Sequence, residues 1–174
     1  SRTEKMAQLI PSGARVIEFG AGRRQLEKFL HSSCSYVASD LTARGPGTII
    51  CDLNRRPLPD LRPVGADTAA FAGVLEYIRD LDSLVDWLAK QFRCCIASYA
   101  YLGSSKSAGS RIQERLERLY YGYMNNYTEA ELIRLFQTRG YVRIKEETWN
   151  NQRIFRFVKQ ETVSASRDGA SQLL

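Results

Sequence analysis

The sequence predicts an α/β domain in which helices cover both faces of a mostly parallel sheet. Two observations predict it: strands and crossover segments alternate along the first part of the chain, and the strands are continuous apolar runs, as is typical of parallel strands buried on both faces. A third observation bounds the size. The chain has 174 residues, 44% of them hydrophobic and 25% charged, which suits one domain with a single core.

The alternating part of the chain supplies five strands. In order, we expect a short helix at 3–9, a strand at 14–19, a helix at 23–31, strands at 35–40 and 47–53, a proline-rich loop at 54–65, a strand at 66–74, a helix at 81–92 and a strand at 93–100. The helix at 23–31 would carry Leu26, Phe29 and Leu30 on one face, and such a stripe packs against a sheet.

The pattern changes after the fifth strand. A Gly/Ser-rich segment at 103–110 precedes a charged helix that begins within 111–127. A further helix is expected at 128–140, because Thr128 and Glu131 form a capping box at its start. Gly140 ends this helix.

Two alternating segments close the predicted fold. Residues 141–149 and 152–160 favour a β-hairpin that turns at Asn150 and Asn151. We therefore expect a single domain over residues 1–160, followed by a polar and frayed tail at 161–174.

Charge and composition disfavour several classes of protein. The net charge is +6, but the arginines are scattered and no RNA-binding motif accompanies them, so a nucleic-acid partner is not expected. No apolar run approaches the roughly 20 residues of a membrane span, and no signal peptide is recognised. The four cysteines lack CxxC spacing, which predicts reduced thiols in a cytoplasmic protein. No metal site is expected.

A glycine turn follows the first strand. Gly20, Ala21 and Gly22 separate that strand from the predicted helix at 23–31. Glycines allow a ligand to approach the backbone closely, and the N-terminus of the helix would favour a carboxylate or phosphate. The alternative is an ordinary tight turn between a strand and a helix.

Three acidic residues accompany the ends of successive strands. Glu18, Asp40 and Asp52 belong to the first, second and third strands, whose carboxyl ends meet at one edge of the sheet. Asp40 could accept hydrogen bonds from both hydroxyls of a ribose, and Asp52 could meet an adenine amino group. The pattern favours an adenosine-containing ligand; the alternative is three solvated carboxylates.

Three nucleotide-like ligands compete for the turn. A Walker A loop needs Gly-Lys-Ser/Thr, which is absent, and a dinucleotide fingerprint needs a glycine where Gln25 stands. The third ligand, S-adenosylmethionine, has no phosphate and less need of a second close approach by the backbone.

Residues 14–100 resemble the class I S-adenosylmethionine-dependent methyltransferases. The segments "VIEFGAG", "YVASDL", "CDLN" and "ADTAAFAGVLEYIRDLDSLVDWL" are similar to the first four motifs of that family, and the final helix and two strands at 128–158 also suit it. The resemblance implies a Rossmann-like, seven-stranded sheet, mostly parallel with an antiparallel last strand and with helices on both faces.

The resemblance also implies a set of cofactor-binding residues. Glu18, Gly20 and Gly22 would border the methionine end, Asp40 would hold the ribose, Asp52 and Leu53 would contact adenine, and Ala72 and Gly73 would lie near the sulfonium. Ala21 and Leu41 complete the set.

The chain departs from the family at three places. Arg24 stands where a third glycine is frequent, and Tyr77 stands where a histidine is usual. Only about a dozen residues precede the first strand, so a lid would be missing or supplied by an oligomer or a larger chain. These departures leave open a catalytically inactive, methyltransferase-like binding module, or one part of a larger polysaccharide-biosynthesis enzyme.

Methyl transfer needs an oriented acceptor and, for a hydroxyl, a base. The only histidine, His31, lies at the far end of the predicted helix and is not expected to act. Glu76, after the fourth strand, is the base candidate. The alternative is a structural role in which Glu76 holds a loop or a backbone amide.

Tyrosines and asparagines suggest where an acceptor binds. Aromatic faces and amide groups suit a flat, hydroxyl-bearing molecule such as a sugar; the alternative is that the tyrosines pack a helix against the sheet. The chain also resembles small bacterial methyltransferases linked to cell-surface polysaccharides, which favours O-methylation of a sugar or another small acceptor. The candidate substrate-binding residues are Tyr99, Tyr101, Tyr123, Asn126 and Tyr127.

The charged helix could attract an anionic acceptor. Arg111, Arg115 and Arg118 would line it near the entrance. Their spacing also fits an ordinary solvated surface with i,i+4 pairs.

Overall fold

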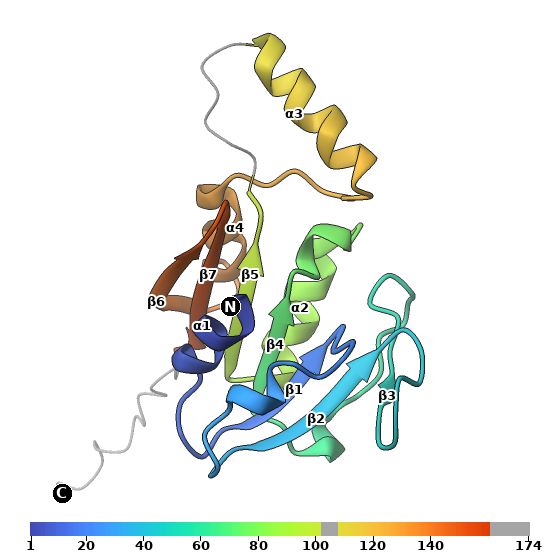
Figure 1. Ribbon diagram of the computed structural model, residues 1–174, viewed down its shortest axis with the longest axis vertical. Coiled ribbons are helices and arrows are strands. Elements are labelled where there is room, and N and C mark those ends of the chain that lie inside the picture. The colour runs from blue at the N-terminus through green and yellow to red at the C-terminus, as the bar shows by residue number, and fades with distance from the viewer. Residues whose placement is uncertain (102–107, 161–174) are drawn as a thin grey trace, which may run out of the picture.

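The computed structural model describes residues 1–101 and 108–160. Within these ranges one sheet has the order β3-β2-β1-β4-β5-β7-β6 (Figure 1). Strands β1 to β5 are parallel, and β7 runs antiparallel to both β5 and β6. This confirms the predicted seven-stranded, Rossmann-like sheet with an antiparallel last strand. The strands are β1 (Arg15–Phe19), β2 (Ser35–Asp40), β3 (Ile49–Ile50), β4 (Thr68–Ala72), β5 (Cys94–Tyr99), β6 (Tyr141–Trp149) and β7 (Gln152–Lys159).

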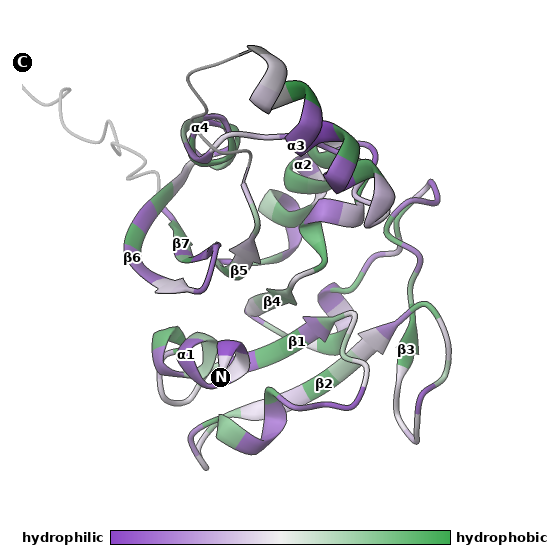
Figure 2. Cartoon of the chain, turned by 45° about the horizontal axis from the view of Figure 1, so that its top comes forward, coloured by the Kyte–Doolittle hydropathy of each residue, from purple (hydrophilic) through white to green (hydrophobic). Residues whose placement is uncertain are grey.

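Helices lie on both sides of the sheet, as predicted. One core cluster joins the sheet to α2 and α4, and a second joins it to α1; α1 and α2 lie on opposite sides in Figure 2. The helix α3 stands beyond the carboxyl ends of β4 and β5 (Figure 1). The α-helices are α1 (Arg2–Leu9), α2 (Leu81–Gln91), α3 (Ala108–Tyr120) and α4 (Glu129–Gln137), and the 3₁₀ helices are η1 (Glu27–Phe29), η2 (Arg62–Val64) and η3 (Leu75–Tyr77).

The strands alternate their buried side chains between these two clusters. Ile17 and Phe19 of β1 belong to the cluster with α2, whereas Val16 belongs to the cluster with α1, because successive residues of a strand point to opposite faces. Phe19 stacks on Phe71 of β4, with ring centroids 5.0 Å apart. The two central strands are therefore buried on both faces, as their continuous apolar runs predict.

The capping signals of α4 are confirmed. The Thr128 hydroxyl accepts the N–H of Glu131, and the Glu131 carboxylate accepts the N–H of Thr128. Gly140 adopts a φ of 81° just beyond the helix. This left-handed conformation favours glycine and turns the chain into β6.

Two predicted elements are wrong in type or length. Residues 23–31 form turns and only the short η1, because Arg24 has a φ of 53° and interrupts an α-helical ladder. Leu26 is fully buried and Leu30 packs against the same core cluster, but Phe29 is 44% exposed and does not belong to the predicted apolar stripe. The strand predicted at 47–53 shortens to the two residues of β3.

The charged helix begins three residues earlier than predicted, since α3 covers Ala108–Tyr120 and so starts within the Gly/Ser-rich segment. Part of the Gly/Ser-rich segment and the whole of the tail predicted at 161–174 lie outside the described residues.

Candidate active site

A cavity of about 190 Å³ opens at the carboxyl edge of the parallel strands. Five predicted cofactor-binding residues line it: Gly20, Asp40, Leu41, Asp52 and Leu53. Sequence reasoning missed the remaining lining residues, which come from the loop after β3 and from the segment around η3. These are Cys51, Asn54, Val74, Tyr77 and Ile78.

Asp40 is the charged centre of this cavity. Its Oδ2 accepts the N–H of Gly22 at 2.9 Å, its Oδ1 accepts its neighbour Leu41's N–H at 2.8 Å, and Arg44 Nε lies 3.6 Å from Oδ1. Burial acts to raise the pKa of Asp40, but the two N–H groups and the guanidinium outweigh it and lower the pKa. Asp40 is therefore an ionised acceptor, and its oxygens retain lone pairs for further donors.

Three backbone N–H groups of the glycine turn are already paired within the protein. The N–H of Ala21 donates to the Ser39 carbonyl, that of Gly22 donates to Asp40, and that of Arg24 donates to the Ala21 carbonyl. No α-helix follows the turn, so the expected helix N-terminus is absent. The turn consequently suits a ligand without phosphates.

Arg24 fixes the turn instead of disrupting the site. Its guanidinium donates to the Pro46 carbonyl at 2.5 Å and to the Thr48 hydroxyl at 3.0 Å. The side chain thus binds the turn to the loop between β2 and β3. Gly20 is needed for a different reason, since a Cβ there would lie 2.6 Å from Cγ2 of Val74.

Glu18 lies at the inner end of the turn and is 2% exposed. The Tyr36 hydroxyl donates to its carboxylate at 2.5 Å. Burial nevertheless raises the pKa of Glu18 to about 7, against the lowering effects of Tyr36 and of the nearby Arg2 charge.

Arg2 reaches the predicted methionine end of the site, and sequence reasoning missed it. Its Nη1 donates to Oε1 of Gln152 at 3.2 Å, and its guanidinium lies over the Trp149 ring. The same guanidinium packs against Gly73, where a Cβ would collide with it. Its Nε is buried and has no hydrogen-bond partner among the described residues. No local signal in the sequence indicates this role, because it depends on how α1 packs beside the sheet.

Gly73 adopts a left-handed backbone conformation at the end of β4. Its φ is 69°, and its N–H donates to the Ser98 hydroxyl at 2.8 Å. Glu18, Ala21, Gly22, Ala72 and Gly73 do not line the cavity of about 190 Å³. Their proposed contacts with the cofactor therefore stay predictions.

Glu76 is buried rather than placed at the mouth of the sheet. It is 1% exposed, and its Oε1 accepts the N–H of Ala100 at 2.8 Å. Its backbone carbonyl accepts the N–H of Met124 at 2.7 Å. Burial raises the pKa of this carboxyl. The structure favours the backbone-holding alternative, because a base must touch the proton it removes.

Tyr99 also corrects a prediction. It is fully buried, and its hydroxyl donates to Oδ1 of Asn125 at 2.5 Å and accepts the N–H of Tyr127 at 3.0 Å. Burial raises the pKa of Tyr99 to about 12. Tyr99 therefore holds the segment after α3 in place and does not form a substrate surface. Tyr101 and Tyr127 are half-buried and pack against the core cluster beneath α4, which is the packing alternative.

Arg118 is an anchor and not a charge at the entrance. It is 6% exposed, and its guanidinium donates to the carbonyls of Ala100 and Asn125 and to Oδ1 of Asn126. The guanidinium also lies 4.8 Å from the centroid of the Tyr123 ring. These bonds fasten the C-terminal end of α3 to the end of β5.

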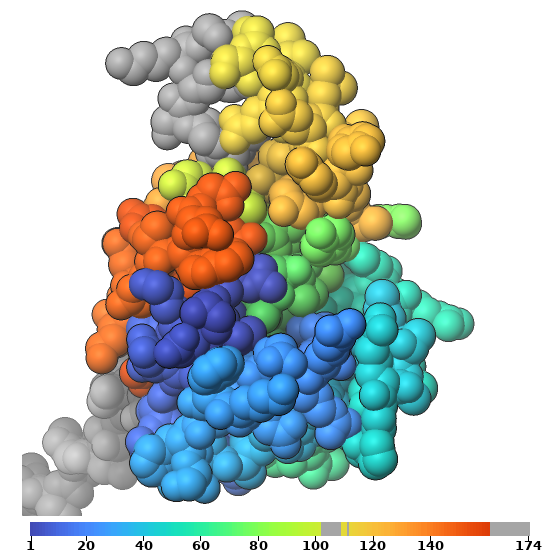
Figure 3. Space-filling view, in the orientation of Figure 1, coloured from blue at the N-terminus to red at the C-terminus, as the bar shows by residue number. Residues whose placement is uncertain are grey.

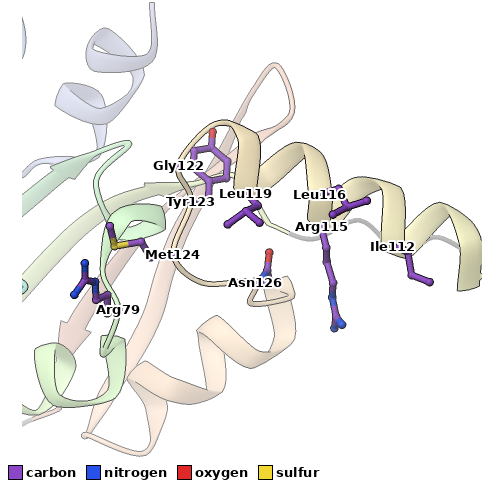
Figure 4. A pocket seen from close by; sticks show the side chains of 9 residues that line it. All are labelled: Arg79, Ile112, Arg115, Leu116, Leu119, Gly122, Tyr123, Met124 and Asn126. Carbon is purple, nitrogen blue, oxygen red and sulfur yellow. The ribbon is translucent and has the colours of Figure 1, made fainter.

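A second cavity of about 680 Å³ lies beneath α3 (Figure 4). Of the predicted substrate-binding residues, it contains Tyr123 and Asn126 but not Tyr99, Tyr101 or Tyr127. We call this cavity the α3 groove. Its full lining is Arg79, Ile112, Arg115, Leu116, Leu119, Gly122, Tyr123, Met124 and Asn126.

Residues 1–101 and 108–160 contain no cluster of three or more potential metal ligands. No helix among them is long and apolar enough to cross a bilayer. The four cysteines are free thiols.

Comparison with known proteins identifies the fold. No known family model and no curated protein matches the chain, whereas solved structures match most of it. Magnesium protoporphyrin IX methyltransferase (ChlM) from Synechocystis PCC 6803, with bound SAH, is 19% identical, with a TM-score of 0.59 over 86% of this chain and 75% of that chain. An S-adenosylmethionine-dependent methyltransferase from Mesorhizobium loti is 14% identical, with a TM-score of 0.66 over 89% and 96%.

A third match concerns a complex of two proteins. A chain in the complex of the Haloferax volcanii Trm112 methyltransferase activator with a methyltransferase is 11% identical, with a TM-score of 0.68 over 92% of this chain and 90% of that chain. Together with the strand order and the cavity at the carboxyl edge, these likenesses show that the chain has the Rossmann-like fold of the class I S-adenosylmethionine-dependent methyltransferases.

Proposed function

We propose that the protein transfers a methyl group from S-adenosylmethionine to a small, hydroxyl-bearing acceptor. The observation that carries this proposal is the cavity at the carboxyl edge of β1 and β2, where the ionised Asp40 lies among apolar side chains. A carboxylate with free lone pairs suits ribose hydroxyls, and the apolar wall suits an adenine ring. A turn whose Ala21, Gly22 and Arg24 N–H groups are already paired suits a cofactor without phosphates.

The chain's own residues would orient the two reactants. Asp40 would hold the ribose, Leu41 and Leu53 would enclose adenine, and Gly73 would let the sulfonium end approach the backbone. When bound, S-adenosylmethionine would supply an electrophilic methyl carbon: the acceptor oxygen would bond to this carbon, the sulfur would keep the electron pair of the broken bond, and the hydroxyl proton would pass to solvent. The role of the protein is mainly to hold acceptor and methyl in line and to exclude water.

The finer expectations stand as parts of this proposal. A sugar is one acceptor class to test, and no described residue ties the chain to polysaccharide biosynthesis. The free thiols are consistent with a cytoplasmic location. The proposal also includes a lid or an activator supplied by another chain. The Haloferax match concerns a complex that contains an activator.

Calorimetry with S-adenosylhomocysteine tests the cofactor. Asp40→Asn preserves the shape of the side chain but removes the charge. We expect it to weaken binding by about tenfold to a hundredfold, since a hydrogen bond to a charged group contributes roughly 1.5–3 kcal/mol. Asp60→Asn is the matched control, because Asp60 is exposed and paired with Arg62. Equal affinities in the wild type and in Asp40→Asn would contradict the assignment.

A second candidate is a binding module without turnover. It is favoured by the position of the Arg2 guanidinium, which lies against Gly73 at the predicted methionine end. Methyl transfer is measured by mass spectrometry with nucleotide sugars and hydroxylated aromatic acids as acceptors. S-adenosylhomocysteine binding without transfer to any acceptor would favour this module.

A further inference from the structure

We propose that the acceptor is an apolar hydroxy acid, a flat or aliphatic body that carries a carboxylate, and that it binds in the α3 groove. This inference rests on the proposed methyltransferase function and specifies its substrate class. Four observations support it. They are a row of exposed aliphatic side chains on α3, two arginines without an ion-pair partner among the described residues, a buried arginine that fastens the end of α3, and an aromatic pair between the groove and the cofactor cavity.

The wall is a row of aliphatic side chains on α3. Ile112, Leu116 and Leu119 are 61%, 61% and 68% exposed, and they follow one another along the helix in Figure 4. The same apolar stripe is visible as green bands on α3 in Figure 2. Met124, 45% exposed, continues the wall. A contiguous apolar surface of this kind marks a binding site more often than isolated exposed residues do.

The charge of the groove is positive. Arg79 and Arg115 line it from the loop before α2 and from α3 (Figure 4). In the described part of the chain, neither guanidinium takes part in an ion pair. Glu131 lies within electrostatic reach of Arg115, but Thr128 already binds its carboxylate. An anionic group on the ligand would give these guanidinium groups a partner.

The groove has a fixed floor. Arg118 fastens the end of α3 to Ala100 and to Asn126, which itself lines the groove. The backbone carbonyl of Glu76 accepts the N–H of Met124, another residue of the lining. In the space-filling view, α3 rises in yellow above the body of the protein (Figure 3). Buried polar contacts therefore fix the C-terminal end of the helix that carries the wall.

An aromatic pair lies between the α3 groove and the cofactor cavity. Tyr77 lines the cofactor cavity and Tyr123 lines the groove, and their rings meet edge to face with centroids 5.3 Å apart. Asn54 of the cofactor cavity donates to the Tyr77 carbonyl and approaches the sulfur of Met124 at 4.0 Å. The α3 groove therefore adjoins the cofactor cavity across this aromatic pair.

These features disfavour the sugar that the sequence suggested. A sugar would place hydroxyl groups against Ile112, Leu116 and Leu119, which offer no hydrogen-bond partner, and burying unpaired polar groups is costly. The apolar body of a hydroxy acid would cover these side chains, and its carboxylate would meet Arg79 or Arg115. The groove volume of about 680 Å³ lies within the usual range for small-molecule sites.

The test uses 6-hydroxy-2-naphthoate as a fluorescent probe, titrated into the full chain saturated with S-adenosylhomocysteine. We expect the naphthoate to bind about tenfold or more tightly than its neutral amide, 6-hydroxy-2-naphthamide. The double variant Arg79→Gln/Arg115→Gln should bind acid and amide equally. Leu116→Gln should weaken both ligands, because it removes apolar contact without touching the charge. Arg134→Gln, on the exposed face of α4, is the control and should match the wild type.

Several results would overturn the inference. Equal binding of acid and amide by the wild type would remove the anionic recognition. Preference for methyl glucoside over both naphthalene probes would restore the sugar. Sedimentation that shows a dimer dissociated by Leu116→Gln, without naphthoate binding, would assign the apolar wall to a second copy of the chain. Retained S-adenosylhomocysteine binding in these cases rejects the acceptor class alone, whereas its loss rejects the proposed function.

Discussion

The Arg2 guanidinium has two alternative roles at the predicted methionine end of the site. Its guanidinium lies against Gly73 and close enough to Glu18 and Glu76 to influence both carboxyl groups. If it pairs with the carboxylate of the cofactor's methionine end, it contributes affinity. If it fills that space, it excludes the same group. The two roles give opposite signs for one substitution.

We expect Arg2→Ala to weaken S-adenosylhomocysteine binding by about tenfold, since a charge-assisted bond is lost. Binding of 5′-methylthioadenosine, which lacks the amino-acid end, should not change. Lys5→Ala on the same helix is the control, because Lys5 makes only a surface pair with Glu147. Tighter binding of S-adenosylhomocysteine by Arg2→Ala would show that the arginine blocks the site. Calorimetry measures the affinity of the wild type, Arg2→Ala and Lys5→Ala for both ligands.

At the scale of elements, α3 depends on one buried side chain. Among the described side chains of that helix, Arg118 alone is buried. Its planar guanidinium makes several hydrogen bonds at once. Lysine keeps the charge but cannot reproduce this fork of donors.

We therefore expect Arg118→Lys to release α3 while leaving the sheet intact. The local free energy of opening should fall by about 1.5–3 kcal/mol. Hydrogen exchange measures it: amides of α3 should exchange faster, and those of β4 should be unchanged. Arg115→Lys, an exposed position on the same helix, is the comparison. Faster exchange throughout the molecule would mean that Arg118 supports the whole fold.

The order of the elements could be predicted from the sequence because local signals agreed with the global fold. The apolar runs of β1, β2, β4 and β5 and the capping box at Thr128 each have one local solution. The helix predicted at 23–31 was wrong although its apolar residues have helical spacing. Arg24 adopts a left-handed conformation, and its hydrogen bond to the distant loop between β2 and β3 stabilises that conformation. Such non-local contacts have no signature in the spacing.

The candidate site divides in the same way. The places of Asp40, which ends β2, and of Asp52, which lies two residues after β3, were predictable because the carboxyl ends of neighbouring parallel strands meet at one edge of the sheet. Arg2 could not be predicted, since its place in the site depends on how α1 packs beside β7. Tyr99 was assigned to a surface because aromatic residues serve both cores and binding sites, and only burial distinguishes the two.

The stability of the whole molecule should depend on the titration of Glu18. Its pKa is raised to about 7 in the folded protein from an ordinary value of 4.5. Between these pH values the folded protein keeps a proton that the unfolded chain has released, so the free energy of unfolding falls as the pH rises. The contribution present below pH 4.5 is lost by about pH 7 and amounts to roughly 3 kcal/mol at most.

Urea unfolding at pH 5 and pH 8 measures this effect. Glu18→Gln removes the titrating group, so its loss of stability between the two pH values should be smaller than that of the wild type. Parallel profiles for the two proteins would show that Glu18 does not titrate in this range.

The position of β7 has a consequence for how the chain is made. This strand is the last of the seven along the described sequence, yet it lies between β5 and β6 and pairs with both. During synthesis β1 to β5 emerge first, and β5 keeps an unpaired edge until the residues of β7 leave the ribosome. An open edge of buried apolar residues is a template for association with other nascent chains. The edge of β5 is thus open to such association during synthesis, and pairing with the final hairpin closes it.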